Sequence, residues 1–160
     1  MLKSLDRNLN KLYKFSGYVA AFFLILVAVF ILIGISSRIF GFYIRGLAEY
    51  SGYCMASASF FALAYTFVEA GHIRITLFLE KLSGFKKKIV EVWCLIVASF
   101  FSGYLAFYFI KMLIISYKFQ ERSEGADEIL IWIPQTGVAI GSTIFFISVF
   151  HQFLNKIIKN

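Results

Sequence analysis

Long hydrophobic segments alternate with short charged segments along this chain of 160 residues. Four of the hydrophobic segments, residues 15–37, 50–68, 92–110 and 129–150, contain no Asp, Glu, Lys or Arg. An α-helix rises about 1.5 Å per residue, so that about 20 apolar residues cross the hydrocarbon core of a bilayer. Each segment has about that length, and the pattern therefore predicts four transmembrane helices.

The charged stretch after the second segment has a helical period of its own. Within residues 72–83, the apolar residues Ile75, Phe78, Leu79 and Leu82 recur at i, i+3, i+4 and i+7, which places them on one helix face. This spacing predicts an interfacial amphipathic helix that lies on the membrane surface with its apolar face down. The alternative is that the stretch simply extends the second membrane helix into water.

The N-terminal residues have a related pattern. Leucines at positions 2, 5, 9 and 12 alternate with basic residues, which predicts an interfacial lead-in to the first helix. Lysines ahead of an apolar stretch also resemble a signal peptide. The apolar stretch is too long for one and has no small-residue cleavage site, so we expect an uncleaved first helix.

Composition agrees with a membrane protein. Hydrophobic residues make up 60% of the chain and the mean hydropathy is +0.79, whereas soluble domains average about 45–50% apolar residues. Charged residues make up 16%, and there is one proline. We therefore expect an all-α fold, a polytopic membrane protein in which residues 1–160 form a single membrane domain.

The net charge of +7 could suggest nucleic acid, but the distribution of the charges indicates a lipid bilayer instead. Eleven Lys and Arg residues lie at the two termini and in the 69–88 loop, against five in the other two loops. Short loops rich in Lys and Arg stay in the cytoplasm. Both termini and the 69–88 loop are therefore expected on the cytoplasmic side of a bacterial inner membrane.

Small residues four positions apart predict places where helices approach closely, because they lie on one helix face and have little side chain. Three such pairs are the candidates for close packing, the last of them a GxxxG motif: Gly52 with Ala56, Ser99 with Gly103, and Gly137 with Gly141.

Tryptophans and lysines near the ends of the predicted helices are expected to anchor them at headgroup depth. These residues are Trp93, Trp132, Lys86, Lys87 and Lys88.

Candidate chemistry is sparse. Ionisable residues inside a membrane usually mark an ion or proton pathway, and the four uncharged segments have no such carboxylate or cation, which disfavours an autonomous small transporter. His72 and His151 fall at the cytoplasmic ends of the second and fourth helices, so a membrane b-type cytochrome that uses them as haem ligands is a further alternative. Because the second helix is expected to run inward and the third outward, Cys54 should lie near the outer side and Cys94 near the inner side of the membrane, too far apart for a disulfide. We expect no enzyme activity, no metal and no cofactor.

The segment that starts His72-Ile73-Arg74-Ile-Thr76-Leu-Phe resembles the small membrane subunit (Q-type, DctQ-like) of tripartite ATP-independent periplasmic (TRAP) transporters. In that family a similar His-Ile-Arg stretch follows the second helix, an acidic residue begins that helix, and a proline opens the fourth helix. Glu49 and Pro134 match the last two features. Thr76 stands where the family commonly has Asp, and Gly71 where Glu often precedes the histidine.

The resemblance implies a scaffold role for the chain. In this family a large multi-helix membrane subunit carries the substrate and sodium sites, and a periplasmic substrate-binding protein delivers an organic anion of the dicarboxylate or sialic acid class. The small subunit braces the large one during sodium-dependent symport. The lack of charged residues in the predicted spans agrees with this role, because a bundle without transport residues needs a partner.

The charge asymmetry predicts the result of cysteine labelling in intact cells. In a background with Cys54 and Cys94 replaced by Ala, Lys87→Cys should be shielded from a membrane-impermeant thiol reagent, while Ser123→Cys should react. The opposite pattern of labelling would refute the predicted orientation.

Overall fold

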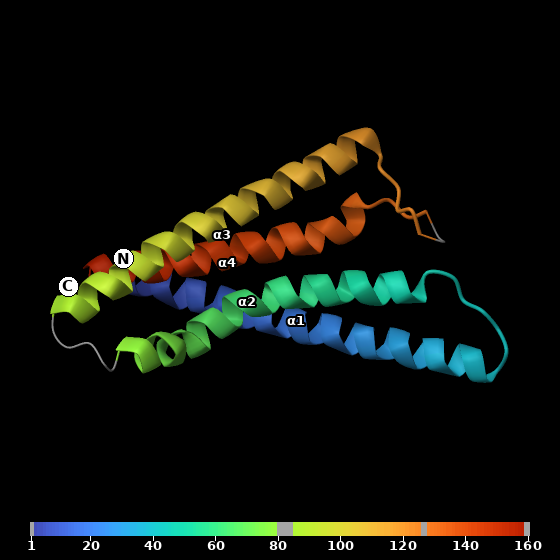
Figure 1. Cartoon of the computed structure of the whole chain (residues 1–160), viewed down its shortest axis with the longest axis horizontal. Helices are drawn as coiled ribbons and strands as arrows, with labels where there is room; N and C mark the ends of the chain where they lie inside the picture. Colours follow the sequence, from blue (N-terminus) through green and yellow to red (C-terminus); the bar gives the residue numbers. More distant parts are fainter. Residues whose placement is uncertain (1, 80–84, 126–127, 159–160) are drawn as a thin grey trace.

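The protein is a row of four long α-helices (Figure 1). The computed structural model describes the backbone of residues 2–79, 85–125 and 128–158, and the side chains of residues 6–69, 87–125 and 128–158. The helices are α1 (Leu2–Ile39), α2 (Leu47–Leu79), α3 (Phe85–Phe119) and α4 (Trp132–Ile158). All four are long and apolar enough to cross a membrane, which confirms the expected all-α membrane fold.

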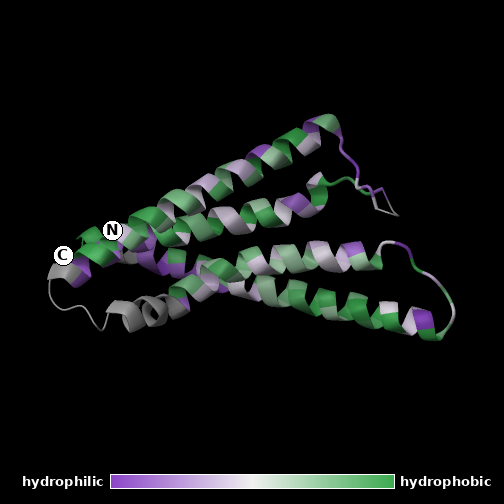
Figure 2. Ribbon diagram, viewed as in Figure 1, coloured by the Kyte–Doolittle hydropathy of each residue, from purple (hydrophilic) through white to green (hydrophobic). Residues whose placement is uncertain are grey.

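The helices extend beyond the uncharged segments that predicted them. With 38 residues, α1 is about 57 Å long, well beyond the roughly 30 Å hydrocarbon core. The charged flanks continue as helix because Lys, Arg and Glu have high helix propensity and do not interrupt the backbone hydrogen bonds. Hydropathy falls toward the ends of the helices and in the loops (Figure 2).

Two predicted boundaries need correction. The fourth helix begins at Trp132 rather than Ile129, because the backbone N–H of Ile131 donates to the carbonyl of Glu121 across a loop, at 3.0 Å. Residues 72–79 are the last turns of α2 and do not form a separate helix. Residues 80–83 lie outside the described part of the chain, and the depth of this stretch in a bilayer stays a prediction.

The helices lie in the order α1, α2, α4, α3. Extensive contacts join α1 to α2, α2 to α4 and α4 to α3, while α1 meets α4 over a shorter stretch. The pair α1/α2 and the pair α3/α4 diverge with distance from the end where both termini lie (Figure 1). As a result α1 and α3 are the edge helices of an open row, and each has a broad outward surface.

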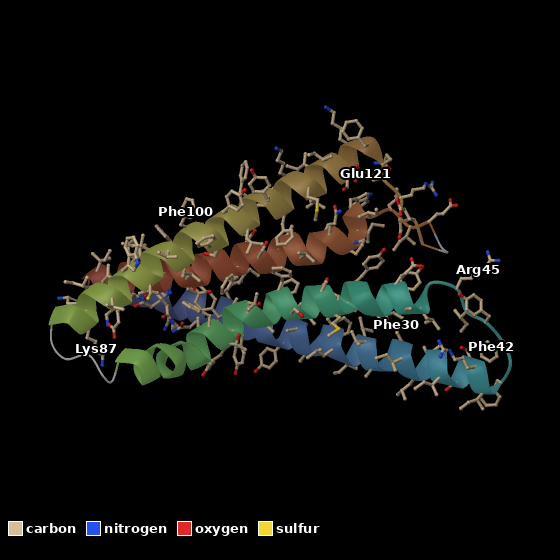
Figure 3. All side chains as sticks on the ribbon, in the orientation of Figure 1. Phe30, Phe42, Arg45, Lys87, Phe100 and Glu121 are labelled. Atoms are coloured by element: carbon tan, nitrogen blue, oxygen red, sulfur yellow. The ribbon has the colours of Figure 1, made fainter. Side chains whose placement is uncertain are left out.

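The interior of the row is built from small side chains. Its buried residues are mostly alanines and serines, among them Ala20, Ala58, Ala64, Ala106, Ala139, Ser16, Ser57, Ser102, Ser142 and Ser148. Large apolar residues point outward instead, as Phe100 does from α3 (Figure 3). This arrangement is typical of helices in lipid, where close backbone approach replaces the burial of large apolar side chains.

The GxxxG motif of α4 lies directly against α2. A Cβ atom built on Gly141 would lie 2.9 Å from the backbone carbon of Phe60 and 2.9 Å from the backbone nitrogen of Phe61. One built on Gly137 would lie 2.3 Å from the Oγ of Ser57. Since real Cβ atoms do not approach backbone so closely, a side chain at Gly141 would force α2 and α4 apart.

The other two small-residue pairs differ in their surroundings. A Cβ on Gly103 would lie 3.0 Å from the ring of Phe146, so that α3 and α4 are also close at this glycine, and Ser99 is half-buried. Gly52, in contrast, has nothing within 4 Å of such an atom, although Ala56 is half-buried. The expected close approach at Gly52 is therefore wrong for this chain, because its side of the helix faces open space.

These contacts predict opposite results for the same substitution at two glycines of neighbouring helices. Gly141→Leu should lower the free energy of unfolding of the detergent-solubilised protein by about 1–3 kcal/mol, the usual cost of overpacking a close contact, and should lower its unfolding temperature. Gly52→Leu should leave stability unchanged or raise it by up to about 1 kcal/mol, because it replaces glycine in an exposed helix. Equal unfolding temperatures for the two variants would contradict the assigned α2–α4 contact.

Candidate functional site

His151, near the C-terminal end of α4, joins α4 to the start of α1. Its Nε2 lies 2.8 Å from the Oδ1 of Asp6, and its Nδ1 lies 3.3 Å from the hydroxyl of Tyr13. The Nδ2 of Asn155 is 2.9 Å from the same Nε2. Tyr13 is 1% exposed, so this group of four residues forms a largely buried contact between α1 and α4. The contact lies at the helix ends where both termini are found (Figure 1).

The geometry favours one arrangement of protons. A ring that carries its proton on Nε2 donates to the carboxylate of Asp6 and accepts a hydrogen bond from the Tyr13 hydroxyl at Nδ1. The terminal oxygen and nitrogen of the Asn155 amide can be exchanged by a flip of the group. With its oxygen toward the ring, the amide is a second acceptor for the Nε2 proton of His151. Both ring nitrogens of His151 are thus occupied by protein groups.

A second contact at the same end joins α4 to α3. The Nζ of Lys156, in the last turn of α4, forms an ion pair with Oε2 of Glu91 in α3. A cation in a last turn is also stabilised by the partial negative charge of the helix C-terminus. Two successive turns of α4 therefore hold both edge helices.

The loop between α3 and α4 folds back over the start of α2 at the opposite end. It contains a short antiparallel bridge between Arg122 and Leu130, and the N–H of Ser123 donates to the carbonyl of Ile129, at 2.8 Å. The hydroxyls of Ser123 and Tyr53 lie 2.9 Å apart, which connects this loop to α2.

Glu49 has a structural place in this contact. It lies in the first turn of α2, where the helix N-terminus stabilises a negative charge. A Cβ atom on Gly125 would overlap the carboxylate of Glu49, which means that the loop passes directly over this group. A side chain at position 125 would require the Glu49 carboxylate to move aside.

The other residues singled out from the sequence lie at the end of α2 and at the starts of α3 and α4. His72, Ile73, Arg74 and Thr76 lie in the final turns of α2, where side chains are outside the described part of the chain, as is the side chain of Lys86. Pro134 is in the first turn of α4, where its missing N–H has no helical partner to lose.

The predicted anchors lie near helix ends. Lys87 and Lys88 are in the first turn of α3, and Trp93 is exposed about two turns further along. Trp132 is the first residue of α4 and packs edge-on against Tyr117, with a distance of 5.4 Å between ring centroids. Their depth in a bilayer stays a prediction.

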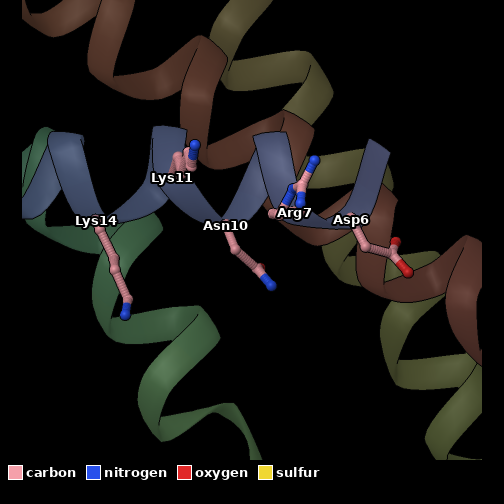
Figure 4. A pocket seen from close by; sticks show the side chains of 5 residues that line it. All are labelled: Asp6, Arg7, Asn10, Lys11 and Lys14. Carbon is pink, nitrogen blue, oxygen red and sulfur yellow. The ribbon is translucent and has the colours of Figure 1, made fainter. Parts of the chain in front are cut away.

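The basic N-terminal turns of α1 border a shallow, open pocket of about 430 Å³. Asp6, Arg7, Asn10, Lys11 and Lys14 line it, and Figure 4 shows their side chains fanning out from α1. Cations at a helix end are suited to the phosphates of anionic headgroups. This placement fits the interfacial lead-in that the sequence predicts.

Sequence analysis missed the group around His151. Asp6 and His151 are 145 residues apart, so no local spacing connects them. One signal was available: Asp6 is the only acidic residue among the basic residues that precede the first uncharged segment. An isolated acid there suggests a cationic or hydrogen-bond donor partner elsewhere in the chain.

The described residues offer little for metal or redox chemistry. Among them, no group of three or more His, Cys, Asp or Glu residues could hold a metal ion. Cys54 and Cys94 are free thiols. A haem at His151 would have to displace Asp6 or Tyr13 from its ring nitrogens, so the ligand set does not fit that group.

The fold and the polar clusters define a polytopic α-helical membrane protein whose ionic contacts lie toward the ends of its helices and act structurally. Comparison with protein families gives a more specific assignment. The family described as tripartite ATP-independent periplasmic transporters, DctQ component, matches residues 26–159. The chain belongs to this family, the small membrane subunits of TRAP transporters, which are transporter components and not enzymes. No curated protein matches the sequence significantly.

The contact between α1 and α4 leads to a test by double substitution. Asp6→Ala and His151→Phe should each lower the free energy of unfolding in detergent by about 1–3 kcal/mol, because each takes a hydrogen-bond partner from a part-buried or buried polar group. The double variant should lose no more free energy of unfolding than the less stable single variant, since either single substitution already removes the contact between Asp6 and His151. Arg7→Ala, an exposed neighbour, is the control and should have little effect. Fully additive losses would contradict the contact.

Proposed function

We propose that this chain is the scaffold subunit of a sodium-coupled TRAP transporter, in which it braces the large membrane subunit for uptake of an organic anion of the dicarboxylate or sialic acid class. Membership of the family supports the role of small membrane subunit. The observation that carries the scaffold role is that the charged contacts of the chain lie toward the helix ends, while the central helix segments contain no carboxylate or cation.

Sodium coupling requires oxygen ligands for the ion at a site that opens to each side in turn. The middle of this row is filled by alanine and serine side chains, and the buried hydroxyls of Ser16, Ser102, Ser142 and Ser148 donate to backbone carbonyls. The Ser16 bond joins α1 to α2, while the other three lie within single helices. All four serines are buried between packed helices, so their oxygens are not open to an ion. The transport site therefore belongs to the partner in this proposal.

The orientation that we propose has both termini and the His151 group on the cytoplasmic side of the inner membrane. The α3–α4 loop then faces the periplasm, where a substrate-binding protein would dock on the large subunit. The count of eleven against five basic residues supports this orientation.

The two alternatives have less support. A b-type cytochrome would need free imidazole nitrogens, and those of His151 are occupied. An autonomous small transporter would need a polar site within the spans, which the alanine-rich and serine-rich core does not supply. Neither is favoured by an observation of its own.

Reconstitution into liposomes tests the proposal. With an inward sodium gradient, uptake of a labelled dicarboxylate or of sialic acid should require this chain, the large subunit and the binding protein together. The chain alone should give no uptake above empty liposomes. Sodium-driven uptake by the chain alone would overturn the scaffold role, and full uptake without the chain would show that the brace is not needed.

A further inference from the structure

The outward surface of α3 differs from that of the other edge helix. Phe100, Tyr104, Tyr108 and Lys111 recur at i, i+4, i+8 and i+11, and so they lie along one face of α3. Tyr104 and Tyr108 are 54% and 47% exposed, and Lys111 is exposed as well. We call these four residues the α3 stripe. It faces away from α4, the neighbour with which α3 makes extensive contact.

The depth of the α3 stripe is unusual for polar groups. Tyr104 lies about 5 Å along the helix from the middle of the uncharged segment 92–110, at about 1.5 Å per residue. Tyrosine hydroxyls are normally found at membrane interfaces, where water can reach them. A hydroxyl exposed to hydrocarbon near the middle of a bilayer lacks hydrogen-bond partners and has a free-energy cost.

The hydroxyls of the α3 stripe cannot fully satisfy each other. The rings of Tyr104 and Tyr108 lie 4.4 Å apart, centroid to centroid. Two neighbouring hydroxyls can pair with each other only once, so at least one O–H proton is left for a further acceptor. The Nζ of Lys111 lies 5.8 Å from the centroid of the Tyr108 ring, and that ring belongs to a residue one turn deeper in the helix. The ammonium group of Lys111 thus lies toward the Tyr108 ring and not toward the nearer membrane surface.

Exposed serine and threonine hydroxyls of the spans, in contrast, are satisfied by their own helices. Those of Ser59, Thr66 and Thr136 donate to backbone carbonyls three or four residues earlier, at 2.6–2.9 Å. The outward face of α1 carries apolar residues over the same depth, such as Phe22, Ile25 and Leu32, which are 57%, 63% and 62% exposed. The surface of α1 suits lipid chains, whereas the α3 stripe suits a partner with hydrogen-bond acceptors.

We propose that the α3 stripe is the surface that binds the large membrane subunit. This inference rests on the proposed function for the existence of that partner. The partner helix would present an acceptor to the free tyrosine proton and a carboxylate, or the carbonyls of a helix end, to the ammonium of Lys111. A pocket of about 290 Å³ continues the surface toward the α3–α4 loop and gives room for a partner side chain. It is lined by Tyr108, Lys111, Met112, Ile115, Ser116 and Glu121.

Photo-crosslinking in the assembled complex tests this surface. The photoreactive analogue p-benzoylphenylalanine replaces Phe100 in one variant and Phe22 in another, because both are exposed phenylalanines on edge helices, 68% and 57% exposed. Each variant is co-expressed with the large subunit, irradiated in membranes and analysed for a covalent adduct. Position 100 should give at least ten times more adduct with the large subunit than position 22.

A second measurement tests the polar groups themselves. The triple variant Tyr104→Phe, Tyr108→Phe, Lys111→Leu keeps the rings and removes the hydrogen-bonding groups. Its recovery with the tagged large subunit should fall at least tenfold, while its thermal unfolding alone in detergent stays near that of the wild type. The control Tyr18→Phe, Tyr43→Phe removes exposed hydroxyls elsewhere and should retain wild-type recovery.

The outcomes separate this inference from the proposed function. If the wild-type chain does not co-purify with the large subunit, the proposed function fails and the docking surface fails with it. If the wild type co-purifies but the adduct forms at position 22 and not at 100, only the docking surface is overturned. Adducts of position 100 with lipid alone, or unchanged recovery of the triple variant, would likewise overturn it.

Discussion

The rest of the structure depends on the backbone contact between α2 and α4 at Gly141. Helices surrounded by lipid gain little from burying apolar side chains, because hydrocarbon chains are as apolar as leucine. Their association depends on dispersion between closely packed atoms, which falls off steeply with distance. The missing side chain at Gly141 lets α4 touch the backbone of Phe60 and Phe61. The carbonyl of Phe61 in turn accepts a hydrogen bond from Ser16 of α1, at 2.6 Å, so that one region of α2 positions both neighbours.

Polar contacts complete this arrangement near the ends of the helices, where water and headgroups lower the cost of charge. His151 and Lys156 of α4 hold α1 and α3 at one end, through Asp6 and Glu91. At the other end the α3–α4 loop lies on α2 through Ser123 and Tyr53. Dispersion at mid-span and ionic or hydrogen-bonded contacts at the ends therefore act in different dielectric environments. Ionic contacts lie where the desolvation of charge costs least, and close apolar contacts lie where no polar solvent surrounds them.

The number of helices followed from the sequence because a bilayer requires about 20 uncharged residues for each crossing. Their ends did not follow, since charged residues continue a helix as readily as apolar ones. Gly141 touches α2, whereas Gly52 faces open space. The spacing of small residues could not distinguish them, because it shows which residues share a helix face but not which helix, if any, packs against that face. The pairing of Asp6 with His151 depends on the order of the helices, and that order comes from tertiary packing. The family was recognisable because its motif is local.

The open row is consistent with the proposed role of the chain as a brace. A closed four-helix bundle would satisfy most of its own lateral surface and leave a partner little to recognise. In the row, α1 and α3 are each held on one side, and their free sides have different chemistry: aliphatic on α1, aromatic with hydroxyls and an ammonium group on α3. Lipid covers the first at little cost, whereas polar groups at mid-span are stable in the membrane when another protein supplies acceptors. With the proposed docking surface on α3, the asymmetry between the two edges would give the row one lipid side and one protein side, as a subunit at the periphery of a larger transporter requires.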